Sequence, residues 1–519
     1  MSPRDPARLP KMTDDQQAVI AFLSRPSSYG LAIERVDVIE THISLVFLAG
    51  DRAYKLKRAV KYPYLDFSAS EQRRWACEAE LALNRRTAPA LYLEVRAVVR
   101  LADGRIAFAG AGPAIDWVVV MRRFEQASLF DALAESGGLS AVLMRELASH
   151  IADFHAIAER RHDCGGAAAL TAIAEMNHRC LIEPQHAGFA RERIDEIREN
   201  SLQQLASVSG LLDRRRAQGK VRRCHGDLHL RNICLFDGKP TLFDCIEFSD
   251  ALASIDVLYD LAFLLMDLEH RRLTDFANIV LNRYLDLTDE DDGLAAMPLF
   301  LSLRAAIRAH VTAAAMDQAA AAERKQEMAA AAQTYLDHAA RLLRPSSKRL
   351  VAIGGLSGSG KSTLAGVLAP AIGARVLRSD VIRKRLFGVA PETRLPANAY
   401  AAEISCLVYE TLRQKATAAL AAGYSVIIDA VSLTPQERRS FAVVAKTAAV
   451  PFSGLWLAAP AAEMERRLRA RRHDASDASP EVLAQQLRQE TGPIDWATID
   501  AGSGPEACLA AARRALALG

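Results

Sequence analysis

Apolar and polar positions follow two periodicities in the first part of the chain, one typical of strands and one typical of helices. Residues 42–60 contain strand-like apolar runs on both sides of Gly50-Asp51, which predicts two strands joined by a tight turn. A helical pattern follows from about Ser70 to Arg86. Further strands are predicted at 93–101, 105–110 and 116–124. The chain up to about residue 125 therefore predicts a small β-rich lobe with one helix.

The middle of the chain, residues 129–343, has a mostly helical pattern that one polar segment interrupts. This segment, CHGDLHLRNICLFDGKPTLFDCIEF, runs from 224 to 248. It contains two short predicted strands, 232–236 and 240–244, on either side of the turn Asp237-Gly238. The two strands and their turn predict a hairpin within an otherwise helical region.

An alanine-rich stretch, 305–343, is strongly helical by propensity, and the segment RPSSK after it is the best candidate for a linker. Beyond this linker, apolar runs alternate with helix-like segments. Such alternation predicts a parallel sheet with helices on both faces. Its five expected strands are 350–355, 374–379, 425–430, 453–459 and 495–501.

These patterns predict an α/β multidomain protein in which a bilobal domain precedes a parallel-sheet domain. A length of 519 residues suits about three compact units. We expect an N-terminal extension with a helix at 1–29, the bilobal domain at 30–344, a linker at 345–348 and the parallel-sheet domain at 349–519.

Composition and charge narrow the functional classes. The formal net charge is +3, from 65 basic and 62 acidic residues, which gives no reason to expect a nucleic-acid or membrane surface. The eight cysteines include no CxxC pair and no zinc-ligand spacing, so reduced thiols in a cytoplasmic protein are expected. The N-terminus has no apolar signal-peptide core, and no run of about 18 apolar residues predicts a membrane span.

The polar segment carries the first set of candidate catalytic residues. Phosphoryl transfer requires a carboxylate near the attacking hydroxyl, ligands for Mg²⁺ and cations on the phosphates. The kinase catalytic loop places an Asp five residues before an Asn, as Asp227 and Asn232 are placed here. Asp244 follows the predicted hairpin, where kinases place a metal-binding Asp.

This segment resembles the aminoglycoside phosphotransferase-like family, which is related to protein kinases, and the resemblance covers roughly residues 30–340. The family pattern HGDxHxxN followed by D matches this chain at His225, Gly226, Asp227, His229, Asn232 and Asp244. The resemblance implies that Asp227 is the catalytic base and that Asn232 and Asp244 hold Mg²⁺. It also implies that Asp260 hydrogen-bonds the backbone of the catalytic loop.

The N-terminal lobe departs from the kinase pattern because no GxGxxG loop precedes its strands. The residues at that place are ETHIS, so backbone amides and the hydroxyls of Thr41 and Ser44 would have to cover the phosphates. Lys55 resembles the strand lysine that binds the α- and β-phosphates, and Lys57 on the same strand face stays an alternative. The helix partner of this lysine is Glu80, with Glu78 as the alternative.

A second set begins with GLSGSGKS, which follows a predicted strand and fits the P-loop pattern. The backbone of such a loop wraps phosphates at a helix N-terminus, where unpaired N–H groups favour anions. Lys361 would reach the β- and γ-phosphates, and the Ser362 hydroxyl would bind Mg²⁺. The expected nucleotide-binding residues are Gly355, Ser357, Gly358, Ser359, Gly360, Lys361, Ser362 and Thr363.

Further polar residues lie after the next strands. Asp380 comes just past the second strand, and Asp429 ends the third, where a carboxylate associated with Mg²⁺ belongs. Arg467 and Arg471 are four residues apart, which predicts one helix face that acts as a phosphate-binding lid. Residues 349–519 resemble the P-loop kinases that include polynucleotide 5′-kinases and zeta toxins. By that resemblance Asp380 activates the acceptor hydroxyl, with Arg383 nearby.

The whole chain resembles bifunctional proteins that join an aminoglycoside phosphotransferase-like domain to a P-loop ATP-binding domain. The expected function is ATP-dependent phosphoryl transfer, with two Mg·ATP sites and small-molecule hydroxyls as acceptors. The alternatives are one active kinase domain beside a nucleotide-sensing regulator, an ATP-bound scaffold, and a polynucleotide or nucleotide end kinase. Long nucleic acid is disfavoured because no basic groove with interleaved aromatic residues is recognised. The acidic run Asp289–Asp292 is interpreted as a loop.

Overall fold

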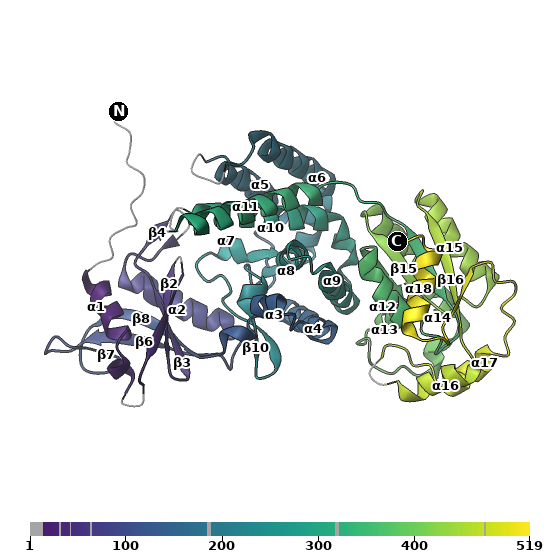
Figure 1. Cartoon of the computed structure of the whole chain (residues 1–519), viewed down its shortest axis with the longest axis horizontal. Helices are drawn as coiled ribbons and strands as arrows, with labels where there is room; N and C mark the ends of the chain where they lie inside the picture. Colours follow the sequence, from purple (N-terminus) through teal and green to yellow (C-terminus); the bar gives the residue numbers. More distant parts are fainter. Residues whose placement is uncertain are drawn as a thin grey trace. The chain divides into compact units, whose positions relative to one another are not determined.

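The computed structural model describes residues 14–30, 33–41, 43–62, 65–183, 188–316, 321–471 and 474–518. The chain forms two compact units (Figure 1). The first comprises Met1–Leu139, Ile157–Gly165 and Arg216–Leu261, and the second comprises Ser140–Ala156, Gly166–Arg215 and Ala262–Gly519. The predicted domain boundary at 345–348 falls inside the second unit, where Ser346 Oγ donates to the carbonyl of Gly423 and Lys348 Nζ to that of Leu420.

A six-stranded antiparallel sheet in the order β1-β2-β3-β8-β6-β7 forms the β-rich lobe predicted for the N-terminal part. Its strands are β1 (Val36–Glu40), β2 (Ser44–Ala49), β3 (Arg52–Lys57), β6 (Tyr92–Arg100), β7 (Ile106–Ala107) and β8 (Ala114–Arg122). Successive β8 residues point to opposite faces. Val118 and Val120 pack with helix α1 (Asp14–Leu23), whereas Val119 and Met121 pack towards helix α2 (Ser70–Asn84).

The polar segment of the first unit forms a loop and a hairpin, as predicted. Strands β9 (Val221–Arg223) and β12 (Ser254–Asp256) pair on either side of it. The hairpin consists of β10 (Ile233–Phe236) and β11 (Lys239–Leu242), with a two-residue turn at Asp237-Gly238. Both turn residues have positive φ, 49° and 76°, which is the turn geometry that suits the twist of a hairpin. The smaller elements are β4 (Lys61–Tyr62), β5 (Leu65–Asp66), α3 (Phe130–Ser136), η3 (Leu230–Asn232) and α7 (Asp250–Ala253).

The second unit contains the predicted helical region. Its helices are α4 (Ala141–Ile157), α5 (Gly166–Leu181), α6 (Arg191–Ala217), α9 (Thr274–Thr288), α10 (Met297–Ala315) and α11 (Ala322–Leu342); α8 (Val257–His270) begins in the first unit. Among the described residues, one helical stretch, Glu290–Ala315, is long and apolar enough to cross a membrane. Within it, 67% of the most apolar window is buried in the protein, as in a core helix.

The acidic run beginning at Asp289 is not a loop. Residues Glu290–Ala296 form the 3₁₀ helix η4, in which Glu290 and Asp291 are buried. Each of these two carboxylates has an ion-pair partner, Arg215 for Glu290 and Arg375 for Asp291. Burial of the acidic run is possible because cations from other elements neutralise it.

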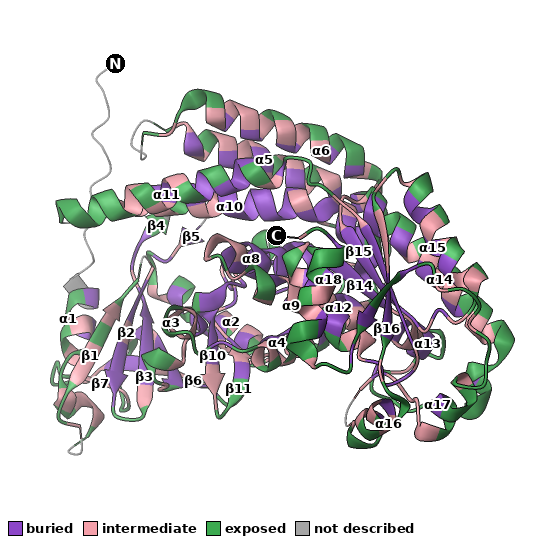
Figure 2. Cartoon of the chain, turned by 45° about the vertical axis from the view of Figure 1, so that its right-hand side comes forward, coloured by how far each residue is buried: buried purple, intermediate pink, exposed green. Residues whose placement is uncertain are grey.

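The predicted parallel sheet is present, with the strand order β14-β15-β13-β16-β17. Figure 2 shows its strands buried. Helices α12 and α18 pack together on one side, and α14 and α15 contact each other on the other. The strands are β13 (Leu350–Gly354), β14 (Ala374–Arg378), β15 (Ser425–Asp429), β16 (Phe452–Ala458) and β17 (Ala497–Asp500). The helices are α12 (Lys361–Ala371), α13 (Ser379–Leu386), α14 (Ala402–Ala421), α15 (Pro435–Thr447), α16 (Ala461–Ala470), α17 (Pro480–Gln486) and α18 (Pro505–Ala515).

Candidate active sites

The catalytic loop of the first unit is fixed by a buried carboxylate. The backbone N–H groups of His225 and Gly226 donate to the two oxygens of Asp260, at 3.1 and 2.8 Å. Asp260 therefore has the backbone-holding role predicted for it. Gly226 has φ +85°, and a Cβ there would lie 3.0 Å from Ile246, so glycine suits this turn.

His225 lies under this loop and is part of its hydrogen-bonded framework. Its Nε2 is 2.9 Å from the carbonyl oxygen of Phe243, and the N–H of Asp227 donates to its Nδ1. Burial lowers the pKa of His225, so the ring is neutral near pH 7, with its proton on Nε2. The ring therefore connects the loop of Asp227 to the end of the hairpin.

Asp227 and Asn232 lie side by side. The Asn232 amide donates to both the backbone oxygen and the Oδ2 of Asp227, at 2.9 and 2.8 Å. His229 Nε2 is 3.4 Å from the same carboxylate. The Asp227 side chain is 38% exposed, so an acceptor hydroxyl can reach it. Because the Asn232 nitrogen is the donor to Asp227, its Oδ1 is available as an oxygen ligand for a cation.

The hairpin brings Asp244 to the same place. The N–H of Phe243 donates to the carbonyl of Asn232 at 3.0 Å, which closes the hairpin beside the catalytic loop. Asp244 has φ +60°, a conformation that aspartate tolerates better than most residues. Its backbone N–H donates to the hydroxyl of Tyr92, and its side chain is 40% exposed. The carboxylate is therefore held by its backbone while its oxygens stay accessible.

A chain of alternating charges joins the sheet of the N-terminal lobe to the segment after the hairpin. Lys55 Nζ lies 2.8 Å from Glu80 and 2.5 Å from Asp244. Lys57 pairs with the other oxygen of Glu80 and also with Glu247. The alternative helix residue, Glu78, instead pairs with Arg74 on the surface. The geometry thus places Lys55 next to Asp244 and makes Glu80 the partner of both lysines.

These buried charges shift one another's protonation. Burial acts against the charged form of Lys55, but Asp244 and Glu80 raise its pKa well above the ordinary value. Burial alone would raise the pKa of Glu80, but Lys55 and Lys57 lower it to about 2. Burial raises the pKa of Glu247 in spite of Lys57. Lys55 and Glu80 are therefore both charged near pH 7.

Ser44 lies at the start of β2 and is fully buried. Its backbone N–H donates to Thr41 Oγ1 at 3.0 Å, while its own hydroxyl has no hydrogen-bond partner among the described residues. This bond orders the turn that stands where kinases have a glycine-rich loop. The expected contact of Ser44 with phosphates remains a prediction.

The P-loop of the second unit connects β13 to α12. Gly355 has φ +137°, and a Cβ there would lie 2.5 Å from the carbonyl oxygen of Leu457, so a larger residue would not fit. Lys361 Nζ donates to the carbonyls of Gly355 and Leu356, at 2.9 and 3.0 Å. Burial lowers the pKa of Lys361, against the opposing effects of Asp429 and Asp380. The hydroxyl of Ser359 is buried with no hydrogen-bond partner among the described residues, which suits a loop built to bind an anion.

Ser362 is the second residue of α12, and Asp429 is the last residue of β15. The two side chains meet at the carboxyl edge of the sheet. Ser362 Oγ donates to Asp429 Oδ2 at 2.5 Å. This hydroxyl–carboxylate pair has the donor chemistry expected for holding Mg²⁺ beside a nucleotide phosphate. Thr363, the next residue of the motif, is exposed.

Asp380 lies in the first turn of α13 and is partly exposed. Burial raises its pKa, with Arg378 acting in the opposite direction and Asp429 in the same one. Nearby Arg383 donates to the carbonyl of Ala399 at 2.7 Å and lies over the ring of Tyr400. Arg383 is therefore held by contacts with residues 399 and 400, and its expected place near the acceptor stays a prediction.

The predicted lid arginines do not share one helix face. Helix α16 ends at Ala470, and Arg471 follows in an extended conformation. Arg467 donates to the carbonyl of Ser359 at 3.3 Å and to that of Ala501 at 2.8 Å. Burial is the main cause of the lowered pKa of Lys361, and the charge of Arg471 acts in the same direction, which places Arg471 near the P-loop as well.

Three residues of this site were not predicted. Arg378 lies 3.3 Å from Ser362 Oγ and 3.5 Å from Asp429, and it pairs with Asp474 at 2.8 Å. Gln486 accepts a hydrogen bond from the backbone of Ser357. The position of Arg378 at the carboxyl end of a predicted strand was a usable signal. Asp474 and Gln486 come from distant loop and helix positions that no motif marks.

Two protein-family models match parts of this chain. The family described as Phosphotransferase enzyme family matches residues 73–300, and the AAA domain family matches residues 350–493. Two relatives are the uncharacterized protein Rv2004c of Mycobacterium tuberculosis H37Rv and the uncharacterized protein Mb2027c of Mycobacterium bovis. Each is 33% identical over 473 residues, which is 89% of this chain and 91% of the relative.

Solved structures similar to parts of the chain include two kinases. A choline/ethanolamine kinase family protein from Mesorhizobium loti has 14% identity and a TM-score of 0.38, covering 63% of this chain and 98% of that protein. A sugar kinase from Janibacter sp. HTCC2649 has 22% identity and a TM-score of 0.26, covering 34% of this chain and 96% of that protein.

Proposed function

Since this chain belongs to the same family as these mycobacterial proteins and joins a phosphotransferase-family domain to a P-loop kinase domain, we propose that it carries two separate Mg·ATP sites. The protein is an ATP-dependent kinase. In the proposal, each site transfers the γ-phosphoryl group to a hydroxyl of a small molecule. The domain boundary at 345–348 and a cytoplasmic location belong to the same proposal.

The observation that carries the proposal is the close grouping of Lys55, Glu80, Asp227, Asn232 and Asp244 in the first unit. Asp227 would accept the proton of the attacking hydroxyl, and Asn232 keeps its carboxylate oriented. Lys55 would bind the α- and β-phosphates and is kept charged by Glu80. Asn232 and Asp244 would hold Mg²⁺, which supplies positive charge for the transferring phosphoryl group.

The second site has its own proton acceptor and cations. Lys361 and the P-loop amides would bind the β- and γ-phosphates, and Ser362 with Asp429 would hold Mg²⁺. Asp380 would orient and deprotonate the acceptor, since its raised pKa brings it closer to the pH at which a base is effective. Arg467 and Arg471 would stabilise charge on the transferred group.

The test is a screen of small-molecule hydroxyl acceptors with γ-labelled ATP. It compares the wild type with Asp227→Ala, Lys361→Ala and the double variant. Each single variant should lose one set of labelled products and keep the other, and the double variant should lose both. Asp153→Ala and Lys325→Ala, at exposed helix positions, are matched controls that should keep all products.

The outcome of the screen also decides between the alternatives. If one single variant keeps every product of the wild type, its site is not a transferase site, and the nucleotide-sensing alternative takes its place. Oligonucleotides with free 5′ hydroxyls are included as further acceptors, and labelling of their ends would identify an end kinase. If the double variant forms the same products as the wild type, both assignments are wrong.

A further inference from the structure

Strand β14 is an edge strand of the P-loop sheet, and amide side chains of α9 cover its outer edge. Asn278 and Asn282 both donate from Nδ2 to the carbonyl of Ala374, at 3.0 and 2.9 Å. The N–H of Val376 donates to Oδ1 of Asn282 at 2.7 Å. Two side chains thus make the hydrogen bonds that a further strand would otherwise supply. This fixes the position of β14 along the helix.

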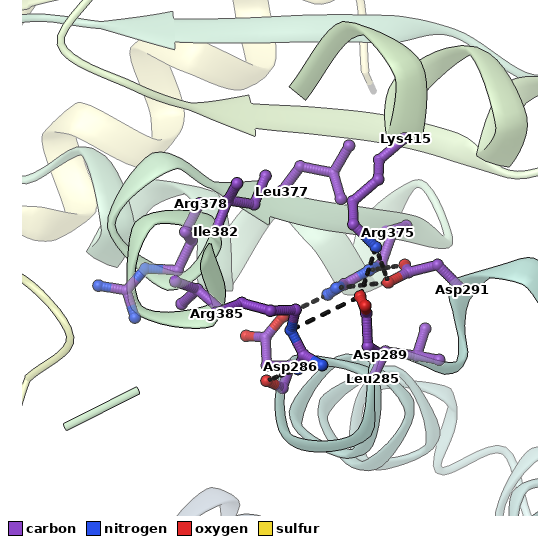
Figure 3. A pocket seen from close by; sticks show the side chains of 11 residues that line it. Leu285, Asp286, Asp289, Asp291, Arg375, Leu377, Arg378, Ile382, Arg385 and Lys415 are labelled. Atoms are coloured by element: carbon purple, nitrogen blue, oxygen red, sulfur yellow. Dashed lines mark hydrogen bonds and ion pairs between the residues drawn. The ribbon is translucent and has the colours of Figure 1, made fainter. Parts of the chain in front are cut away.

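Strand β14 is also held in position by a buried charged residue, Arg375. Arg375 is 4% exposed, and its guanidinium donates to Asp291 at 2.7 Å and to Asp286 at 2.6 Å (Figure 3). Lys415 also pairs with Asp291, at 3.0 Å. Burial alone would raise the pKa of Asp291, but Arg375 and Lys415 lower it to about 2. Asp291 is therefore ionised near pH 7 and pairs with a guanidinium that is almost completely buried.

The strand held in this way leads directly into the P-loop site. Arg378 is three residues after Arg375, about 10 Å along an extended strand. Its guanidinium contacts Ser362 Oγ and the Asp429 carboxylate, the pair expected to hold Mg²⁺. A shift of β14 along α9 would therefore move Arg378 relative to both groups.

We propose that Arg378 is a positioning residue of the P-loop site, and that Asp291 and Asn282, acting through Arg375 and β14, hold it in place. The proposal rests on the proposed function of that site. Arg378 keeps the Ser362 hydroxyl and the Asp429 carboxylate in the arrangement that accepts a cation. Residues of the preceding helical region thereby become part of the machinery of the P-loop domain.

The experiment uses the full chain with Asp227→Ala, so that only the P-loop site remains. Asp291→Asn should lower Mg·ATP hydrolysis about tenfold and raise the Mg²⁺ concentration needed for half-maximal rate, as losses of indirect metal-site contacts do. Asp289→Asn is the matched control. Asp289 belongs to the same acidic run and pairs with Lys415 and Arg385, but it is 43% exposed, and the ion-pair partners of Arg375 are Asp286 and Asp291 instead. Its rate and Mg²⁺ dependence should match the parent.

Combining variants separates positioning from general destabilisation. If Asp291 acts through Arg378, Asp291→Asn should add nothing to the loss caused by Arg378→Met. Effects that multiply, or an Asp291→Asn rate equal to that of the parent, would overturn the proposal. If Asp291→Asn does not fold, Asn282→Ala replaces it, because it removes two of the three strand-edge bonds without leaving a buried charge.

Hydrogen exchange supplies a readout that does not depend on activity. In Asp291→Asn or Asn282→Ala, amides of 376–380 should exchange at least several times faster than in Asp289→Asn. Unchanged exchange there contradicts the proposal even if hydrolysis falls. Lys361→Ala tests the proposed function separately. If it hydrolyses ATP like its parent, the P-loop assignment fails, and hydrogen exchange still decides whether α9 positions β14.

Discussion

Glu80 is a buried carboxylate that two ammonium groups hold at once. Each of its oxygens pairs with one lysine of β3, because Lys55 and Lys57 point to the same face of the strand. Lys55 then reaches Asp244, and Lys57 reaches Glu247. One helix residue thus orients the two lysines that face the segment after the hairpin.

Replacing Glu80 with Gln should weaken both the fold and the first site. The variant leaves two buried ammonium groups with one fewer carboxylate, which we expect to lower the free energy of unfolding by about 3 kcal/mol. The KM for ATP at the first site should rise, because Lys55 loses its orientation. Denaturant unfolding and ATP kinetics in a Lys361→Ala background measure the two effects.

Glu78→Gln is the matched control for this prediction. Glu78 lies two residues away on the same helix, and its side chain is 53% exposed and pairs with Arg74. Loss of an exposed pair should change stability by no more than about 0.5 kcal/mol. Equal effects of the two substitutions would show that Glu80 has no special role.

At the residue scale, sequence spacing predicted the presence of these groups but not their pairing. Lys55 and Lys57 point to the same face of one strand, so the sequence does not show which of them is next to the metal-binding carboxylate. The structure distinguishes them because Asp244 pairs with Lys55. Asp474 and Gln486 were missed for the same reason, since they approach the P-loop from separate elements. Motifs describe local chain geometry, whereas these contacts depend on tertiary packing.

At the element scale, helices α8 and α11 bring together three titratable side chains. His338 Nε2 lies 3.8 Å from Glu269, and Arg341 donates to His338 Nδ1 at 2.5 Å. Burial raises the pKa of Glu269 to about 7, with Arg341 opposing the shift. Burial lowers the pKa of His338 to about 3. The fold therefore favours the uncharged form of both groups.

Glu269→Gln should stabilise the protein at and above pH 7. In the unfolded chain Glu269 ionises around its ordinary pKa of 4.5, whereas in the fold it keeps its proton up to about pH 7. The wild type should therefore lose stability as the pH rises from 4.5 to 7, and the variant should avoid this loss. We expect an advantage of about 1–3 kcal/mol at pH 8 that disappears below pH 4.5.

Urea unfolding at a series of pH values measures this difference. Glu323→Gln, on the exposed first turn of α11, is the control and should show no such pH-dependent gain. An advantage of Glu269→Gln that is constant with pH would contradict a raised pKa as its cause.

Elements with strong local signals could be predicted from the sequence. The turn residues Asp237-Gly238 and the five apolar strands of the parallel sheet gave clear patterns. Two local features could not be predicted. Helix α16 ends before Arg471, and the acidic run folds as η4. The η4 structure depends on cations from distant elements, which local patterns do not contain.

At the scale of the whole molecule, the two proposed nucleotide sites lie in different compact units. Binding to a folded site stabilises it by an amount set by the ligand concentration, about 2.7 kcal/mol at one hundred times Kd. We therefore expect Mg·ATP to raise the unfolding temperature of the wild type through two separable contributions. Asp244→Ala should remove one contribution and Lys361→Ala the other, as measured by scanning calorimetry.

The double variant should show no stabilisation by Mg·ATP. A shift that survives in the double variant would place nucleotide binding outside both sites. A shift abolished completely by either single variant would contradict independent sites and would indicate that nucleotide binding at one depends on the other.

Because the chain is synthesised from its N-terminus, the edge of β14 that the α9 amide side chains cover also matters during synthesis. Helix α9 leaves the ribosome well before β14, since Asn282 precedes Val376 by 94 residues. The surface that satisfies the strand's outer backbone groups is therefore made first. A nascent edge strand without such a surface can pair with another chain. We therefore expect the helical region, which precedes the sheet in the chain, to protect the newly made strand against intermolecular pairing, and a permuted gene that encodes the P-loop domain first to lose that protection.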